Sequence, residues 1–402
     1  MTEVTVADIE AARALLADVV VHTPVEESRW LSQVTGGQVR LKCENLQRTG
    51  SFKARGAYVR IARLGPEERA RGVVAASAGN HAQGVALAAQ LLGIRATVFM
   101  PEGAPIPKER ATRAYGAEVV FRGRYLEDSL AEARRFAEET GAVLIHPFDH
   151  VDVVAGQGTV GLEVLEQVPD VRTVVVPTGG GGLLAGVALA VKAHDPTIRV
   201  VGVQAEGAAA FPGSLRQGAP VALTSMKTMA DGIAVGLPGD VTFAAVRDHV
   251  DEIRTVSEES LSRALLALLE RAKLVVEPAG AAGVAAVLDD PAAFGGSTVV
   301  LLSGGNIDPL LLGKVIHHGM AAAGRYVTLR VRLADVPGGL AELLGEVGRA
   351  GANVLEVSHA RTSPALDLDE VEVLLQLETR GEPHAAQVRD RLAECGYRVQ
   401  QL

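Results

Sequence analysis

The sequence predicts an α/β protein, built around parallel sheets with helices on both faces and followed by a smaller antiparallel unit. Short β-branched runs alternate with helix-like stretches through most of the chain, which is typical of a parallel sheet. Glycine accounts for 44 of 402 residues, more than the usual ~7%, and indicates loops where backbone comes close to a ligand. The expected strands are 73–76, 97–100, 173–176, 200–204 and 298–302. The expected helices are 126–139, 261–271 and 278–288.

The hydrophobic pattern changes after Gly324. Apolar and polar residues alternate over 327–333 and again over 371–377, which predicts half-exposed antiparallel strands. The remaining expected elements are a helix at 337–349, a strand at 353–360, a helix at 384–394 and a strand at 398–401. Their order is βαββαβ, the ferredoxin-like arrangement. We therefore expect two domains, 1–324 and 325–402.

Charge and cysteine content exclude several classes of protein. Lys and Arg total 39 against 48 Asp and Glu, a formal net charge of −9, which argues against a surface that neutralises nucleic-acid phosphates. Cys43 and Cys395 lie far apart without partners at metal-ligand spacing, so neither a disulfide framework nor a zinc module is expected. The start of the chain lacks a signal-peptide pattern, and the uncharged stretch 174–191 contains glycines and a proline that would break a spanning helix. We expect a cytoplasmic protein that acts on a small molecule and binds neither nucleic acid nor a membrane.

Four consecutive glycines, 179–182, follow an expected strand and precede a helix. Backbone N–H groups at a helix start attract phosphate, and residues without Cβ let it come close. Gly180, Gly182 and Ala185 also fit the dinucleotide pattern G-x-G-x-x-A, with Glu206 near the end of the next strand. The segment therefore predicts a phosphate site that two kinds of cofactor could use.

Lys53 is the candidate for covalent chemistry, because lysine is rare in this chain. The sequence contains 7 Lys and 32 Arg, so arginine serves wherever a generic positive charge is enough. An amine can form a Schiff base with an aldehyde cofactor and later move a proton, whereas a guanidinium stays protonated. Lys42 is the rival on the same argument, and a solvated surface charge is the ordinary explanation of any single lysine.

Two polar segments follow other expected strands. Ser77-Ala78-Gly79-Asn80-His81 supplies hydroxyl and backbone donors that suit a carboxylate, and Asn80 can also hydrogen-bond a phenolic oxygen. From the residues alone we assign no role to His81, because a lone histidine is more often a core or surface residue than a catalyst. Ser303 follows 298–302, where a hydroxyl at the carboxyl end of a parallel strand faces the crevice that binds ligands.

Together these segments resemble those of the serine/threonine dehydratases, which are fold-type-II pyridoxal phosphate enzymes with a two-lobed parallel-sheet fold like that of the tryptophan synthase β chain. Residues 326–402 resemble an ACT domain, with its ligand-loop pattern at Asp335-Val336-Pro337-Gly338. The resemblance thus covers the whole chain and is strongest to threonine ammonia-lyases with one C-terminal ACT domain. It implies that 1–324 is the catalytic domain and 325–402 the ACT regulatory domain.

The resemblance also implies a role for each site residue. Lys53 would hold pyridoxal 5'-phosphate as a Schiff base and then remove the Cα proton of the substrate. Ser303 would meet the pyridine nitrogen, and Asn80 the ring oxygen. The implied cofactor-binding residues are Lys53, Asn80, Gly179, Gly180, Gly181, Gly182 and Ser303. The implied substrate-binding residues are Ser77, Ala78, Gly79, Asn80 and His81.

The implied reaction is β-elimination of the hydroxyl of L-threonine to give 2-oxobutanoate and ammonia, with L-serine giving pyruvate by the same route. Related racemases carry a second serine where this chain has Ala78, and because alanine cannot move a proton, racemisation is not expected as the main activity. Some relatives bind a cation through an acidic residue that matches Glu206 and a second one nearby, which this chain lacks, so no metal is expected. The resemblance further implies an amino-acid effector at the ACT domain and a homo-oligomer, either dimer or tetramer.

Three alternatives stay open on the residues alone: a dehydratase that prefers serine, a nicotinamide-dependent oxidoreductase and a non-enzymatic amino-acid sensor. Serine and threonine differ by one methyl group, which a pocket discriminates by only about 1–3 kcal/mol. An oxidoreductase leaves Lys53 and the Ser77 loop unexplained, and a sensor leaves Lys53, Asn80 and Ser303 unexplained. The identity of the effector, and a role in isoleucine biosynthesis as against degradation, are not fixed by the sequence.

Overall fold

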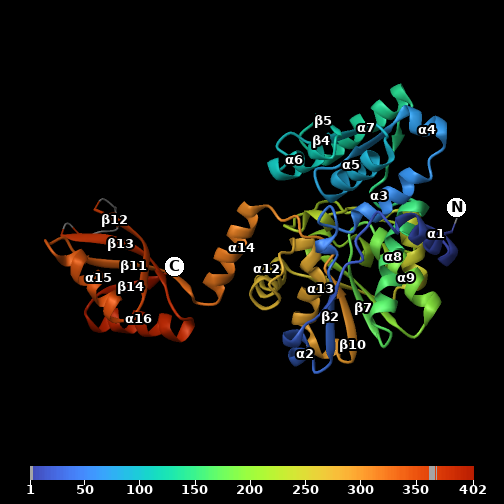
Figure 1. The fold of residues 1–402 in the computed structure, drawn as a ribbon. Helices are drawn as coiled ribbons and strands as arrows, with labels where there is room; N and C mark the ends of the chain where they lie inside the picture. The colour runs from blue at the N-terminus through green and yellow to red at the C-terminus, as the bar shows by residue number, and fades with distance from the viewer. Residues whose placement is uncertain (1–2, 362–366, 368) are drawn as a thin grey trace. The chain divides into compact units, whose positions relative to one another are not determined.

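The computed structural model describes residues 3–361, 367 and 369–402, and the chain forms two compact units, Met1–Asp308 and Pro309–Leu402 (Figure 1). The division lies before the expected boundary at Gly324, because helix α14 (Pro309–Ala322) contacts strand β11 (Tyr326–Ala334) and belongs to the second unit. The segments that carry the expected chemistry therefore all lie in the first unit.

A six-stranded sheet forms the larger part of the first unit. Its order is β1 (Val25–Glu27), β2 (Gln38–Lys42), β10 (Ser297–Leu301), β7 (Thr173–Pro177), β8 (Arg199–Ala205) and β9 (Glu252–Val256). Neighbouring strands are parallel except for β1, which runs antiparallel to β2 at the edge. Every residue of β7 and β10 is buried, as continuous apolar strands covered on both faces should be. The expected strands at 173–176, 200–204 and 298–302 are thus confirmed.

A second, four-stranded sheet is parallel throughout. Its order is β5 (Glu118–Phe121), β4 (Ala96–Met100), β3 (Val73–Ala76) and β6 (Val143–Leu144). Each sheet has its own hydrophobic core, with Val174 and Val200 in the first, and Val73 and Val98 in the second. We refer to the two parts as the six-stranded lobe and the four-stranded lobe. They confirm the expected arrangement of parallel sheets.

Helices pack against both sheets, with α5, α6 and α7 against the four-stranded one (Figure 1). The helices of the first unit are α1 (Val6–Leu16), α2 (Arg29–Thr35), α3 (Lys53–Ala62), α4 (Pro66–Arg71), α5 (Asn80–Leu92), α6 (Ile106–Ala114), α7 (Leu126–Thr140), α8 (Val151–Gln167), α9 (Gly182–His194), α10 (Ala210–Gln217), α11 (Asp240–His249), α12 (Glu258–Ala267) and α13 (Pro278–Asp289). The expected helices at 126–139 and 278–288 are confirmed. The one at 261–271 is correct only in part, because α12 ends at Ala267 and a π-helical turn, Leu268–Ala272, follows it.

The second unit carries the expected βαββαβ order after helix α14. Its further elements are α15 (Gly339–Arg349), β12 (Asn353–Ala360), β13 (Glu370–Glu378), α16 (Glu382–Glu394) and β14 (Arg398–Gln401). The sheet is antiparallel in the order β12-β13-β11-β14. Successive residues of β11 alternate between buried and partly exposed positions, so one face of the sheet packs on the helices, as the period of two predicts.

Across the described ranges of the chain, the helices all fall short of the length and apolar character that crossing a membrane requires.

Four charged side chains are buried together where β2, α3 and α8 meet. Arg55 donates hydrogen bonds to both carboxylate oxygens of Glu44 (2.8 Å each) and to Glu163 (2.6 Å). Lys42 Nζ donates to Glu163 and to the carbonyl oxygen of Thr23 (2.8 Å). Burial raises the pKa of the Glu44 carboxyl, but the guanidinium of Arg55 outweighs burial and holds that pKa below its usual value. The network therefore contains two cations and two anions, and it fixes the first turns of α3 against the six-stranded lobe.

Replacing Arg55 with Met should lower the free energy of unfolding by about 3–5 kcal/mol, because two buried carboxylates lose their shared partner. Urea unfolding at neutral pH measures this change. Arg135→Met is the matched control, since Arg135 pairs with Glu132 and Glu139 on an exposed helix face and should cost less than about 1 kcal/mol. Equal losses in the two variants would contradict a structural role for the buried network.

Candidate active site

The segments singled out in the sequence meet at the carboxyl ends of the parallel strands. Ser77 follows β3, the glycine run follows β7, and Ser303 follows β10. Backbone hydrogen bonds join two of these segments, since Phe52 N donates to Ser303 O (3.2 Å) and Gly305 N donates to Gly50 O (2.8 Å). These bonds fix the start of α3 beside the end of β10.

Lys53 is the first residue of α3 and points its amine into the protein. Its Nζ donates a hydrogen bond to the carbonyl oxygen of Pro147 (3.0 Å) and lies 5.2 Å from the ring centroid of Phe52. Burial lowers the pKa of Lys53 to about 8, although the negative charge of Glu277 opposes the shift. Such an amine loses its proton far more readily than a surface lysine. The rival Lys42 is instead occupied by the buried ion network.

The side chain of Asn80 joins the two lobes. Its Nδ2 donates to Glu277 Oε1 (2.6 Å), and its Oδ1 accepts from Asn306 Nδ2 (2.8 Å). Asn306 also donates to the carbonyl oxygen of Thr49 (2.7 Å), in the loop before α3. Because both ends of the amide are engaged, its orientation is fixed, and the second Nδ2–H remains for a ligand oxygen.

Glu277, which the sequence reasoning missed, is the carboxylate of this site. It precedes α13 and is 2% exposed, and its Oε2 has no hydrogen-bond partner among the described residues. Burial and the nearby Asp231 raise its pKa to about 7, while Lys108, Asn80 and Lys53 act in the opposite direction. One signal was available, because Glu277 is the single charged residue in the otherwise apolar stretch 274–288.

A side chain at position 304 would press against this carboxylate. A Cβ there would lie 2.2 Å from Glu277 Oε1 and 3.2 Å from Asn80 Nδ2. Glu277 N also donates to the carbonyl oxygen of Gly304 (3.0 Å). The Ser303 loop, the Asn80 amide and the start of α13 are therefore packed against one another, and Ser303 itself is 3% exposed.

The Ser77–His81 loop leads directly into helix α5, whose start is not capped by a side chain. Helix α5 begins at Asn80 with no side-chain cap, so its first N–H groups are available to an anion. Ser77 Oγ accepts from Gly79 N (3.1 Å) inside the loop, and Ala78 lies between them. His81 turns the other way and donates from Nε2 to the carbonyl oxygen of Ile145 (2.8 Å). Burial lowers the pKa of His81 to about 3, so the ring is neutral at neutral pH.

The glycine run is shaped by packing as well as by any ligand. A Cβ on Gly180 would lie 2.5 Å from the ring of Phe148, and one on Gly182 would lie 3.0 Å from Phe148 Cβ. Gly181 has φ +94°, a conformation that favours glycine, and helix α9 starts after it with no side-chain cap. Phe148 follows Pro147, whose carbonyl oxygen accepts from Lys53 Nζ, so this turn connects the amine to the glycine run.

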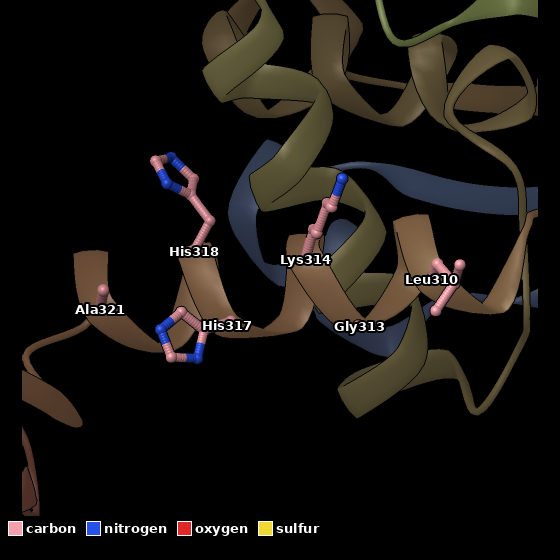
Figure 2. Close-up of a pocket in the computed structure, with 6 residues that line it drawn as sticks. All are labelled: Leu310, Gly313, Lys314, His317, His318 and Ala321. Carbon is pink, nitrogen blue, oxygen red and sulfur yellow. The ribbon is translucent and has the colours of Figure 1, made fainter. Parts of the chain in front are cut away.

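A surface pocket in the second unit contains none of the expected site residues. Figure 2 shows that a single face of helix α14 lines it. Its lining residues are Leu310, Gly313, Lys314, His317, His318 and Ala321.

Comparisons with known proteins agree with this geometry. Residues 16–305 match the family described as pyridoxal-phosphate dependent enzymes. The chain is 49% identical to an L-threonine ammonia-lyase from Thermotoga maritima, over 98% of this chain and 99% of that relative. A solved threonine deaminase from T.th. is 47% identical with a TM-score of 0.72, over 76% of this chain and 99% of that one. The solved maize serine racemase is 38% identical with a TM-score of 0.75, over 80% and 99%.

The raised pKa of Glu277 predicts a pH-dependent effect of Glu277→Gln. An acid whose pKa rises from 4.5 to about 7 on folding makes the folded state less stable as pH increases through that window. The glutamine variant lacks this loss, so its free energy of unfolding relative to the parent should grow by up to about 3 kcal/mol between pH 4.5 and 7.5. Urea unfolding at several pH values measures this difference, with Glu138→Gln, a substitution at an exposed glutamate, as control. A difference that does not change with pH would refute the assignment.

Proposed function

The chain belongs to the family of pyridoxal-phosphate dependent enzymes, and from this premise we propose that it deaminates L-threonine to 2-oxobutanoate and ammonia. It is a lyase with pyridoxal phosphate as its cofactor. The observation that carries the proposal is the amine of Lys53, partly buried, hydrogen-bonded to Pro147 O and of lowered pKa, in the same site as the Asn80 amide and the Glu277 carboxyl. A nicotinamide-dependent oxidoreductase would use neither Lys53 nor this pair.

The residues present fit the cofactor. Lys53 supplies an amine that deprotonates readily, and the uncapped start of α9 with the glycine run 179–182 offers backbone donors for a phosphate. Ser51 Oγ and Glu277 Oε2 are among the buried side-chain oxygens without a partner in the described residues, as a site built for another polar group should show. We assign Ser303 to the pyridine nitrogen and the free Nδ2–H of Asn80 to the ring oxygen.

The bound cofactor supplies an electron sink for negative charge at the substrate Cα. Lys53 would hold the cofactor, and its Nζ would take the Cα proton of the substrate. The Ser77–His81 loop would bind the substrate carboxylate through backbone donors and so orient the Cα–H bond. Ser303 would offer a neutral hydroxyl, and no charged partner, to the pyridine nitrogen.

Ala78 is the residue that argues against racemisation as the main activity. A racemase needs an acid on the opposite side of Cα from its lysine, and a methyl side chain cannot supply a proton. His81 does not serve as that acid, because its ring is neutral and its Nε2 is hydrogen-bonded to the carbonyl oxygen of Ile145. L-Serine should react by the same elimination and give pyruvate, since it differs from threonine by one methyl group.

We assign the second unit as an ACT regulatory domain within 325–402. Its βαββαβ order and the turn before α15 support this, because Gly338 has φ +92° and opens the helix without a side-chain cap. The edge strand β12 exposes Leu355 (46%) and Val357 (37%), which favours pairing with a second copy of the chain. An amino-acid effector would bind there, in a dimer or tetramer.

Borohydride reduction of the cofactor-loaded protein, followed by peptide mapping, should place the label on Lys53. Lys53→Ala should lose turnover by at least about a thousandfold, because it loses both the covalent attachment and the base. A label on Lys42 or Lys108 would show that the assignment is wrong.

Removal of the residues after Gly324 should leave threonine deamination intact and abolish any response to isoleucine or valine. The reason is that all assigned site residues precede 308, whereas an effector acts only by binding one state better than another. Steady-state kinetics on the full chain and the shortened chain, with each amino acid titrated, measures this. A full chain that ignores every amino acid, or a shortened chain that is still inhibited, would contradict a regulatory role.

A further inference from the structure

Lys108 is a buried lysine beside the Ser77–His81 loop that the chemistry above does not use. It lies on α6 in the four-stranded lobe and is 7% exposed. Its Nζ donates to Asp231 Oδ2 (2.7 Å), in the turn Asp231–Ile233 of the six-stranded lobe. The Asp231 side chain is 61% exposed, so the lysine is the member of the pair that is largely removed from water.

The ammonium of Lys108 faces the middle of the Ser77–His81 loop. It lies 4.0 Å from the point where a Cβ on Gly79 would stand. Apart from the chain neighbours of Gly79, no other described atom lies within that distance of this point. The space beside Gly79 is therefore bounded by the backbone of the loop on one side and by a cation on the other.

An ammonium has three donors, and the hydrogen bond to Asp231 uses one of them. A carboxylate held by the loop would thus find donors on Lys108 as well as on the backbone. Asp231 and the ionised form of Glu277 would repel a substrate carboxylate, and the charge of Lys108 offsets this repulsion. Asp231 in turn fixes the position of the flexible lysine side chain.

We propose that Lys108 is a substrate-binding residue whose ammonium, positioned by Asp231, recognises the α-carboxylate of the amino-acid substrate at the Ser77–His81 loop. This inference rests on the proposed function and extends it, because it adds one charged side chain to the backbone donors that select α-amino acids over simple amines. Lys53 stays the group that acts on Cα.

Two threonine analogues separate carboxylate recognition from other effects. L-2-Aminobutanoate keeps the amine and carboxylate but has no hydroxyl to eliminate, and 1-amino-2-propanol keeps the amine and hydroxyl but has no carboxylate. Each is titrated into the cofactor-loaded protein, and the change in the visible absorption spectrum gives its dissociation constant. Lys108→Met should weaken 2-aminobutanoate binding about tenfold or more, since a charge-assisted hydrogen bond is lost, and should leave 1-amino-2-propanol within about twofold.

Lys108→Arg should keep 2-aminobutanoate binding within about threefold of the parent, because the charge remains. Lys108→Gln is the second uncharged variant and is measured in the same way if Lys108→Met does not fold. The matched control is Lys192→Met, which breaks a Lys–Asp pair of similar length (2.8 Å to Asp251) in the last turn of α9, about 15 Å from the glycine run by helix length. This control should change neither dissociation constant.

If Lys108→Met weakens the binding of both analogues equally, the proposal is wrong, and Lys108 instead helps to hold the two lobes together around the site. No weakening of either would also overturn the proposal. A parent protein that responds spectrally to neither analogue would instead refute the proposed function, and the carboxylate assignment with it, so the two failures are distinguishable.

Discussion

The side-chain amide of Asn80 is the contact on which the geometry of the site depends. It extends from the four-stranded lobe and is held at one end by Glu277 and at the other by Asn306, both in the six-stranded lobe. The absence of a side chain at position 304 leaves room for this contact, since a Cβ there would lie 2.2 Å from Glu277 Oε1. Asn306 extends the same chain of hydrogen bonds to Thr49, just before α3. The Asn80 amide therefore ties the start of α5 to the Ser303 loop, to the start of α13 and to the segment that leads to Lys53.

The buried charges of the first unit fall into two groups that behave differently. In the network around Arg55, opposite charges are paired closely enough to hold the Glu44 carboxyl ionised despite its burial. In the site, burial dominates, so the pKa of Lys53 falls to about 8 and that of Glu277 rises to about 7. Proton transfer at neutral pH requires groups of the second kind, whereas a fixed framework requires the first.

Much of the architecture could be predicted from the sequence, because local patterns of hydrophobic residues determine the individual strands and helices. The strands around β3, β7 and β10 are continuous apolar runs, and the βαββαβ order of the second unit follows from its period of two. The scarcity of lysine indicated both Lys53 and Lys42, and only the family resemblance chose Lys53; the structure places Lys42 in the buried ion network instead. The π-helical turn after α12 departs from the expected helix and has no local signal that we recognise.

What could not be predicted depends on contacts between distant parts of the chain. Glu277 before a proline looks like an ordinary helix start, and its partner Asn80 lies 197 residues away. The pairing of Lys108 with Asp231 spans 123 residues and exists only because the lobes meet. The packing of Gly180 and Gly182 on Phe148 also could not be predicted, since in the sequence four consecutive glycines indicate only a ligand loop. Local patterns thus predicted the elements, while the charged neighbours of the site required the fold.

The central claim is that this site removes the hydroxyl and amino groups of L-threonine without inverting Cα. Proton NMR of L-threonine incubated with the purified, cofactor-loaded protein tests it most directly, with ammonia assayed in the same sample and any remaining amino acid resolved on a chiral column. The account predicts 2-oxobutanoate and ammonia in equal amounts and no D-allothreonine, the product of inversion at Cα. Threonine that stays unchanged, or that is converted to D-allothreonine without 2-oxobutanoate, would contradict the account.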